Sequence, residues 1–501
     1  MLDSPRTRST IGMFFLVCLC TVGYTQTGEN DYRIEMEIQP GQNQPSLVPV
    51  GELGFILFEI SKEKQAGQVK LYFSKYSTDL DLEWKTSINL TKRLELTEHD
   101  FFENFLYLIF HDELNQEIQV LKIRPESGHF ESHTFKSLKR IEIHDFTVLN
   151  DKVYLSGSLK HIPVVLKLDP VTNYARILPT TFKGREIEIQ EIFTDENKQQ
   201  VSIIISTQRH NNNSIIIRTY DDRGGVSEDI VLDPPQQYDF LNGKFFQLDN
   251  GEKIIIGTFA YRASVHSQGF YIAKFQGDEL KYRKYHSFTD LENFFSFLDE
   301  KDRLKKESMI EKKKSKGKDL RIQYRLLVHD VIIQGDQYVM IGEAYYPEYV
   351  SNSYSDFFTS YSRKPGDFIF DGYQFTHAVI AGFDNQGALI WDNTFNIHDY
   401  KSFDLKRRVK VNTNKQSQDI VLLYALEGMI HKLVINKGQI IQQNDQLELA
   451  APNDLVKQSD LGQAEYWYDN YFIAWGYQKL IKSQEVGQRK RNIFYINKMN
   501  F

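Results

Sequence analysis

Short apolar segments alternate with polar turns along the whole chain, and they come in pairs that recur at a nearly constant spacing. Each pair is typical of two neighbouring β-strands, because its segments are rich in β-branched and aromatic residues. The first segments of the eight pairs begin at residues 54, 105, 152, 201, 253, 337, 419 and 471. Successive starts are mostly 47 to 52 residues apart. A repeat of this length, built from strands and turns, predicts a β-propeller.

Two intervals are longer, at 84 and 82 residues, and they lie on either side of Gln337. Each contains an extra segment of roughly 30 residues, and removing these segments restores the period. Most units add one apolar segment before the pair and one after it, which predicts four strands per unit. The turns at 249–251, 385–387 and 436–438 end in glycine, which tolerates the positive φ of a tight hairpin.

The predicted fold is therefore all-β, a single eight-bladed β-propeller, with seven blades as the alternative count. A string of separate β-sandwiches is the competing architecture, but sandwiches rarely keep one period over a whole chain. The last unit has only three evident strands and ends at Phe501, while an isolated segment with strict alternation stands at 32–38. We expect this N-terminal strand to complete the last blade and so cover two exposed sheet edges.

Composition agrees with one large domain. The chain has 501 residues, of which 41% are hydrophobic and 13% aromatic, so it can bury a sizeable core. The formal net charge of −7 argues against a general nucleic-acid surface. We expect a monomer without a cofactor or a metal, and no membrane span after the first residues.

The first 25 residues are typical of a secretory signal peptide, since Arg6 and Arg8 precede an apolar run at 11–22 that is too short to span a bilayer. We expect cleavage after Thr25, which leaves the propeller domain at 26–501 with a net charge of −8, because Asp3, Arg6 and Arg8 together remove +1. The predicted location is secreted or periplasmic.

Both cysteines of the chain, Cys18 and Cys20, fall within this leader. The mature chain would then have no thiol, disulfide or cysteine nucleophile. A lipoprotein anchor on one of them is the alternative, although Val17 and Leu19 stand where a small residue should precede the lipidated cysteine.

The first insertion, approximately 289–323, opens with a possible capping box, Thr289 and Glu292. Four apolar residues follow at helical spacing, which predicts an amphipathic helix packed on the propeller: Leu291, Phe294, Phe295 and Leu298. The continuation at 301–321 holds ten basic and four acidic residues. It is either a solvated tail or a docking patch for an anionic surface or partner.

The second insertion, approximately 345–375, is rich in aromatic residues, which supply large and stiff contact areas for a sugar or a protein partner. They could instead only pack the insertion onto the ring. The candidate ligand-binding residues are Tyr345, Tyr346, Tyr349, Tyr354, Phe357, Phe358, Tyr361 and Tyr373. In an up-and-down blade, the loop between the second and third strands emerges on the same face as the connection between blades. Both insertions should therefore flank blade six on one face.

The same topology places His329 and Asp330 near the mouth of the central channel, and His144 and Asp145 at the equivalent position of blade three. Histidines hydrogen-bonded at blade ends are one interpretation, and a ligand-binding role for His329 and Asp330 is the other. Metal-dependent phosphohydrolases use His-Asp pairs on helices, whereas these lie on strands or turns. We therefore predict no metal and no catalytic residue.

The sequence contains none of the common catalytic motifs that we considered. The chain has no G-x-S-x-G elbow, no H-E-x-x-H and no phosphate-binding glycine loop. Glu343, Asp356 and Asp371 could form a carboxylate pair for glycosidic cleavage only if the fold brought them together.

The segment 382–391, Gly-Phe-Asp-Asn-Gln-Gly-Ala-Leu-Ile-Trp, resembles the tryptophan-docking repeat of eight-bladed quinoprotein dehydrogenases and of the outer-membrane assembly lipoprotein that shares their ring. Trp84 repeats part of it, so the resemblance covers about two of eight blades. It implies an eight-bladed ring. The mature chain lacks the vicinal disulfide of those dehydrogenases, which puts a quinone cofactor in doubt.

Taken together, these features predict a secreted or periplasmic, non-catalytic binding propeller for a protein or carbohydrate ligand on the face that holds both insertions. The alternative is an envelope enzyme, a hydrolase or lyase acting on polysaccharide, with a site at the channel mouth near blade six.

Overall fold

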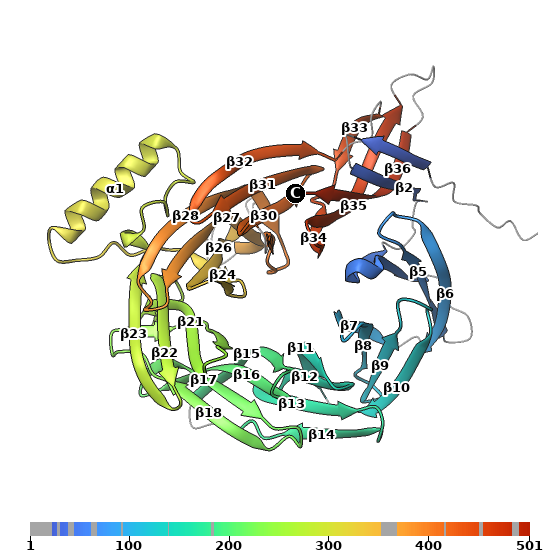
Figure 1. Ribbon diagram of the computed structural model, residues 1–501, viewed down its shortest axis with the longest axis horizontal. Coiled ribbons are helices and arrows are strands. Elements are labelled where there is room, and N and C mark those ends of the chain that lie inside the picture. Colours follow the sequence, from blue (N-terminus) through green and yellow to red (C-terminus); the bar gives the residue numbers. More distant parts are fainter. Residues whose placement is uncertain are drawn as a thin grey trace, which may run out of the picture.

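The computed structural model describes residues 23–27, 31–38, 45–61, 68–91, 94–138, 140–181, 185–351, 368–414, 417–449, 454–482 and 490–501. In it the chain forms a ring of eight antiparallel sheets around a central channel, which is an eight-bladed β-propeller (Figure 1). This confirms the predicted architecture and decides for eight blades over seven. No helix in this part of the chain is long and apolar enough to cross a bilayer.

The blades follow one another in sequence, and the first strand of each lies nearest the channel (Figure 1). The first four blades comprise β3 (Ser46–Pro49), β4 (Phe55–Ile60), β5 (Gln68–Tyr76) and β6 (Leu82–Thr91); β7 (Glu95–Phe102), β8 (Phe105–Asp112), β9 (Glu117–Ile123) and β10 (Phe130–Lys136); β11 (Ile141–Leu149), β12 (Lys152–Leu159), β13 (Ile162–Asp169) and β14 (Tyr174–Leu178); and β15 (Arg185–Asp195), β16 (Gln200–Arg209), β17 (Asn212–Tyr220) and β18 (Val226–Leu232). A 3-10 turn, η1 (Gly51–Leu53), joins β3 to β4.

In blades five, six and eight the innermost strand is divided in two. These last four blades comprise β19 (Tyr238–Phe240), β20 (Lys244–Gln247), β21 (Glu252–Tyr261), β22 (Gly269–Gln276) and β23 (Glu279–Ser287); β24 (Arg325–Val328), β25 (Ile332–Gln334), β26 (Gln337–Ser351), β27 (Phe368–Asp384) and β28 (Leu389–Ser402); β29 (Lys410–Thr413), β30 (Asp419–Leu426), β31 (Met429–Asn436) and β32 (Gln439–Glu448); and β33 (Asp454–Ser459), β34 (Gln463–Tyr468), β35 (Tyr471–Lys482) and β36 (Lys490–Asn500), with β2 (Asp31–Glu37) and β1 (Gly23–Thr27).

The core consists of apolar layers between blades. Among the described residues there are eight buried clusters, one in each gap between neighbouring blades. The middle strands point one set of side chains at the blade before and the other at the blade after, so they are apolar on both faces. In β8, for example, Leu108 joins the cluster toward blade one and Ile109 the cluster toward blade three.

The two ends of the chain close the ring. Strand β2 pairs antiparallel with β36, as predicted for the N-terminal segment, and the blue and red strands lie side by side in Figure 1. The buried Arg33 of β2 donates to Asn497 Oδ1 and Gln478 Oε1, both at 2.8 Å, and also to the carbonyl of Leu449. The predicted leader lies outside the described residues up to residue 22, and the expected cleavage point after Thr25 falls within β1, which pairs with β2.

The tryptophans that suggested a docking repeat do dock between blades. The indole of Trp391 on β28 lies against Gly438, in the turn between β31 and β32 of the next blade, where a Cβ would approach it to 2.4 Å. Gly438 has φ +82°, so this turn requires glycine both for its conformation and for the contact. Trp84 on β6 behaves in the same way, since its Nε1 donates to Pro125 O at 2.7 Å and its ring lies against Gly128 of blade two.

The first insertion contains a helix, but not where the sequence predicted it. Residues 291–298 form turns after η2 (Phe288–Asp290), and the helix is α1 (Glu300–Lys314), with Asp299 as its N-cap. The apolar residues nevertheless pack on the propeller as expected, because Leu291, Phe294 and Phe295 are buried against blades five and six.

Tertiary hydrogen bonds replace the predicted helix. The carboxylate of Asp392 accepts hydrogen bonds from the N–H groups of Glu292 at 2.9 Å and Asn293 at 2.7 Å. In a helix beginning here, these N–H groups would belong to the first turn and would have no partner within the helix. Thr394 Oγ1 donates to the carbonyl of Asn293 at 2.5 Å. The segment is therefore held by β28 of blade six, and its local helical pattern does not decide its conformation.

Candidate functional site

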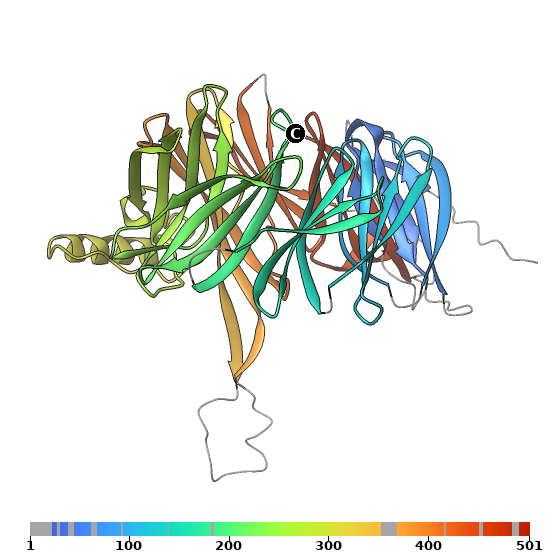
Figure 2. The same cartoon turned by 90° about the horizontal axis from the view of Figure 1, so that it is seen from below.

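Blade six extends beyond the ring. Strands β26 and β27 remain paired as far as Ser351 and Phe368, whereas β24 reaches only Tyr345 and β28 only Tyr373. The two-stranded projection that results leaves one face of the ring (Figure 2). We call residues 346–351 and 368–372 the arm. Among the described residues, neither edge of the arm has a neighbouring strand.

Exposed apolar side chains gather on the arm. Tyr349 is 55% exposed and Phe403, at the start of the connection to blade seven, is 70% exposed. Tyr346, Val350 and Ile369 are exposed as well. The register pairs Tyr349 with Phe370 on one face of the arm and Val350 with Ile369 on the other, so both faces expose large apolar side chains, which an isolated soluble protein usually avoids.

A continuous aromatic ladder supports two of these exposed residues, Tyr349 and Phe403, from inside the blade. It starts at the buried Phe375 and Tyr345, whose ring centroids are 6.0 Å apart, and Tyr345 meets Tyr373 edge-on at 5.7 Å. Phe370 then contacts Tyr373 at 4.9 Å. It also meets Tyr349 at 5.8 Å and Phe403 at 6.2 Å. The ladder makes the base of the arm stiff, since each ring is packed against the next.

Ion pairs also connect the base of the arm to β28. The ammonium group of Lys401 pairs with Glu348 Oε2 at 2.8 Å and with the carboxylate of Asp371, one residue on each strand of the arm. The hydrogen bonds that Lys401 donates to Asp371 and Glu348 raise its pKa above the ordinary value. Because the pairs are solvent-exposed, they fix the geometry of the arm more than they stabilise it.

The structure separates the predicted aromatic residues into three groups. Tyr346 and Tyr349 are exposed on the arm, whereas Tyr345 is buried and Tyr373 half-buried within the ladder. The remaining candidates lie outside the described residues: Tyr354, Phe357, Phe358 and Tyr361. Phe403 was missed because it lies beyond the insertion, in a connection whose sequence shows no aromatic cluster.

His329 and Asp330 lie between β24 and β25, halfway along the innermost strand of blade six, and they serve different purposes. His329 is buried, and its Nε2 lies 2.6 Å from Oε1 of the fully buried Glu343. Glu343 also accepts the backbone N–H groups of Arg408 and Val409. His329 therefore helps to fix the start of blade seven.

Asp330 instead faces the channel, as part of a charged ring. Four blades have an acidic residue four positions before the end of the innermost strand: Glu98, Asp145, Glu191 and Asp330. Lys244 of blade five bridges two of them, at 2.8 Å from Glu191 and 2.6 Å from Asp330. Arg407 lies 3.6 Å from Asp330. The ring could not be found from His-Asp pairs, because only Asp145 and Asp330 belong to such a pair.

In this charged ring, the carboxylates of blades two and three, Glu98 and Asp145, have less nearby positive charge than Glu191 and Asp330. Burial, with the nearby carboxylates of Glu191 and Asp100, raises the pKa of Asp145 to about 6. Burial also raises the pKa of Glu98, although the Lys406 cation opposes it. At Asp330 burial acts to raise the pKa, but Lys244 and Arg407 outweigh it and the pKa falls below its ordinary value. Asp330 is therefore ionised, and Asp145 titrates in a near-neutral range.

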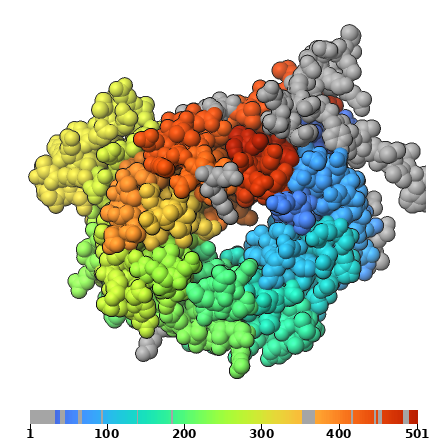
Figure 3. All heavy atoms as spheres, viewed as in Figure 1, coloured from blue at the N-terminus to red at the C-terminus, as the bar shows by residue number. Residues whose placement is uncertain are grey.

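A cavity of about 590 Å³ lies against the channel near blades one, two, seven and eight. Its charged lining comes largely from the connection between β28 and β29, including Lys406, Arg407 and Arg408, and it faces His99 and Asp100 of blade two. The opening at the centre of the ring is visible in Figure 3. Cations and carboxylates are interspersed here, so the cavity has no strong preference for either sign of ligand.

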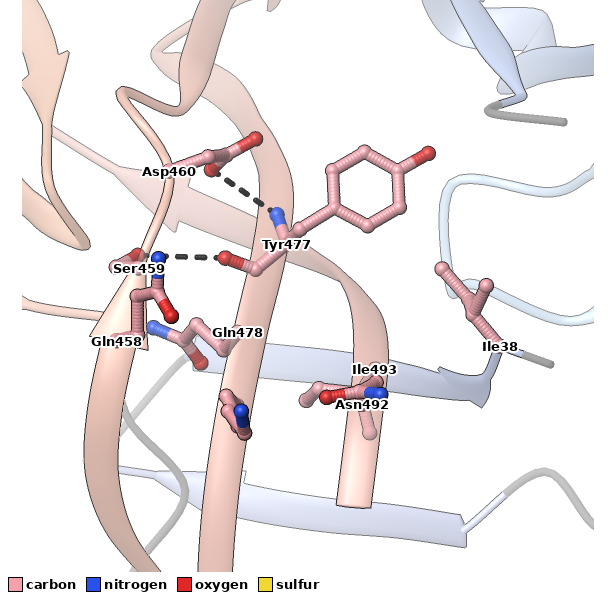
Figure 4. Close-up of a pocket in the computed structure, with 9 residues that line it drawn as sticks. Ile38, Gln458, Ser459, Asp460, Tyr477, Gln478, Asn492 and Ile493 are labelled. Carbon is pink, nitrogen blue, oxygen red and sulfur yellow. Dashed lines mark hydrogen bonds between the residues drawn. The ribbon is translucent and has the colours of Figure 1, made fainter. Parts of the chain in front are cut away.

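A second, shallower pocket of about 310 Å³ lies on blade eight, where the innermost strand is interrupted (Figure 4). There Asp460 Oδ1 accepts the N–H of Tyr477 at 3.0 Å and of Gly462 at 3.1 Å. The carboxylate is thus used to hold the strand interruption together. Within the described residues, no group of three or more His, Cys, Asp or Glu side chains could hold a metal ion.

No family model matches the sequence, and no curated protein matches it either. Solved structures that align with the fold include the polysaccharide lyase Uly1, at 9% identity and a TM-score of 0.40, covering 92% of this chain and 99% of the lyase. The dihydro-heme d1 dehydrogenase NirN aligns at 10% identity and a TM-score of 0.45, covering 93% of this chain and 79% of NirN. The Dos1 propeller aligns at 8% identity and a TM-score of 0.39, covering 89% of this chain and 95% of Dos1. At these identities and TM-scores, no activity, ligand or partner is transferred to this chain.

Proposed function

We propose that the protein is a non-catalytic binding propeller of the cell envelope, secreted or periplasmic, that recognises a protein partner through the arm. The observation that supports this most is the exposed pair Tyr349 and Phe403 at the end of a packed aromatic ladder. The opposite face of the arm is apolar and exposed as well, with Tyr346, Val350 and Ile369. Exposed aromatic anchors on a stiff support are typical of the centres of protein interfaces. The two open strand edges of the arm could also pair with an extended segment of the partner.

A protein partner fits the arm better than a carbohydrate. Stacking on a sugar requires a ring face that is free and flanked by polar groups. In the arm, Phe370 meets Tyr349, Tyr373 and Phe403 at interplanar angles of 64°, 65° and 77°, so these rings cover one another. What remains exposed is a mixed apolar surface with tyrosine hydroxyls, which is more typical of a protein interface.

The alternative of an enzyme at the channel mouth near blade six has less support. A general base must be free to take a proton from the substrate. His329 is buried against Glu343, and Asp330 is paired with Lys244 and Arg407. Neither residue is therefore free to act on a substrate there.

The proposal is tested by capture and affinity measurements. The chain is used to capture partners from the envelope fraction of its source cells, and the captured protein is purified and titrated against variants. We expect Tyr349→Ser/Ile369→Ser to weaken its binding by about 1,000-fold, because each exposed anchor contributes about 2 kcal/mol at the centre of an interface.

A matched control is available on blade three. Tyr174 and Ile177 on β14 are 64% and 52% exposed, against 55% and 52% for Tyr349 and Ile369. Tyr174→Ser/Ile177→Ser should leave the affinity unchanged. If both double variants bind like the unaltered chain, the arm is not the binding site.

A further inference from the structure

Helix α1 stands apart from the rest of the molecule. It projects from the side of the ring at blades five and six (Figures 1 and 2), and only Ile310 of its fifteen residues is buried. Lys314 ties its C-terminal end to the ring through Thr289 O at 3.0 Å and Asp290 Oδ1 at 2.6 Å. A helix that is polar nearly all round gains little from burial, so its position is not explained by packing alone.

The charges of this segment are opposite to those of the chain as a whole. Residues 301–321 contain ten basic and four acidic residues, a net +6. Since the whole chain has a formal net charge of −7, the remaining residues sum to −13. Helix α1 itself, at 300–314, holds seven basic and four acidic residues, a net +3, so the positive charge is shared between the projecting helix and the residues 315–321 that follow it.

Within α1 the charges are also sorted by direction. At 3.6 residues per turn, Lys301, Lys305 and Lys312 fall in a sector about 40° wide that points away from the buried Ile310. Three of the four acidic residues fall in a second sector on one flank of the helix, Glu300, Glu307 and Glu311, and Asp302 lies on the other flank. The three lysines are exposed, and none has an ion-pair partner among the described residues. Their charge is thus available to a partner.

The shape and chemistry of this face point to the kind of partner. Lysine ammonium groups attract as point charges, without the two-pronged geometry that arginine offers to a particular carboxylate or phosphate. The lysines lie on a convex ridge, which a broad flat surface can meet and a narrow groove cannot. Met309 is exposed near the same face, whereas Leu304 is exposed on the acidic flank, so the apolar residues form no continuous stripe for deep insertion.

We propose that the outward face of α1, with Lys301, Lys305 and Lys312, is a docking surface for a lipid bilayer whose headgroups carry negative charge. Basic clusters on a helix bind such surfaces by charge alone, and the attraction decays over a Debye length of about 8 Å at physiological salt. Because α1 projects from the rim, it can enter this layer while the anionic ring remains outside it. Docking would hold the propeller at the envelope without a membrane-spanning helix.

Vesicle co-sedimentation of the full chain tests this proposal. We expect the chain to sediment with phosphatidylcholine vesicles that contain phosphatidylserine, to stay in solution with phosphatidylcholine alone, and to be released by added salt. Lys301→Glu/Lys305→Glu/Lys312→Glu should weaken the vesicle affinity by roughly 100-fold, given the contribution of each lysine near an anionic surface.

The control changes the same charge elsewhere. Lys85→Glu/Lys136→Glu/Lys281→Glu alters three exposed lysines of blades one, two and five and should retain vesicle binding. Equal sedimentation of the α1 variant and the unaltered chain would overturn the proposal. Binding of soluble polyglutamate to α1 at least as tightly as to the vesicles would also overturn it, because the partner would then be an acidic polypeptide.

Discussion

His377 on β27 shows how one buried side chain can hold an insertion against the ring. Its imidazole is fully buried and stacked on Phe297 at 3.9 Å, with Phe294 and Tyr324 edge-on at 5.0 and 5.5 Å. Its Nδ1 lies 2.9 Å from Thr376 Oγ1, and Nε2 has no hydrogen-bond partner among the described residues. Burial lowers the pKa of His377 from 6.5 to about 3. The imidazole of His377 is therefore neutral in the folded protein.

This neutral histidine predicts a dependence of stability on pH. The unfolded chain protonates His377 below pH 6.5, whereas the folded chain does so only near pH 3, so its stabilising contribution is full above pH 6.5 and is lost as the pH falls toward 3. Relative to His377→Leu, the free energy of unfolding should fall by up to about 1.4 kcal/mol per pH unit in this window. Urea titrations of both proteins across it measure the difference. A constant difference would contradict the assignment.

Trp467 links the last blade to the first, and its loss should weaken the closure of the ring. It is 3% exposed, meets Phe55 edge-on at 5.8 Å and donates to Gly54 O at 2.7 Å. Trp467→Ala should lower the free energy of unfolding by about 3–5 kcal/mol, as for other buried tryptophans. Trp467→Phe retains the ring contact, and Gly54 O still accepts Val50 N–H, so we expect a loss of only about 1 kcal/mol. Urea denaturation of both variants measures these losses. Equal losses in the two variants would show that the ring contact with Phe55 contributes little.

At the scale of elements, the period of the apolar pairs was sufficient to predict the blades, because it repeats eight times and an error in one unit does not alter the ring. The closing strand was indicated separately, by the strict alternation at 32–38. The helix of the first insertion was misplaced because residues 291–298 have a helical apolar pattern but are held by Asp392 of β28. The true helix, α1, has almost no apolar face and therefore gives no periodic signal.

The candidate site was only partly predictable for a similar reason. The density of tyrosine and phenylalanine indicated the second insertion, and Tyr346 and Tyr349 are exposed there. Which aromatic residues pack inward depends on the strand register and on the β-bulge between Glu348 and Tyr349. The ion pair between Glu191 and Lys244 in the charged ring joins two different blades. A single charged residue in a strand gives no sequence signal for a contact of this kind.

The ring should keep its stability when the two strands of the arm are joined by a short turn. The residues of the arm beyond Tyr345 contact one another, β28 and Phe403, and they do not join the layers between blades. Ser351 and Phe368 are paired, so replacing residues 352–367 by Asn-Gly gives a two-residue hairpin of favoured type. We expect the melting temperature to be unchanged, as measured by calorimetry. A marked fall would mean that the removed segment packs on the ring.

At the scale of the whole molecule, the account requires a closed ring. Strand β2 contributes the buried Arg33 and covers the edge of β36. Removal of residues 1–38 should expose that edge, leave the partners of Arg33 unsatisfied and give a protein that aggregates on size-exclusion chromatography. Removal of residues 1–30 keeps β2 and deletes β1, so this shorter truncation should remain a single soluble species. Identical behaviour of the two truncations would contradict closure by β2.

The central claim is that the arm is the surface that meets the partner. The most direct test is hydrogen–deuterium exchange of the chain with and without the captured partner. We predict slower exchange at 346–351 and 368–372 in the complex, because the open strand edges of the arm become hydrogen-bonded or covered, with little change in the strands that line the channel. Protection confined to the channel-lining strands, with the arm exchanging as in the free protein, would contradict the account.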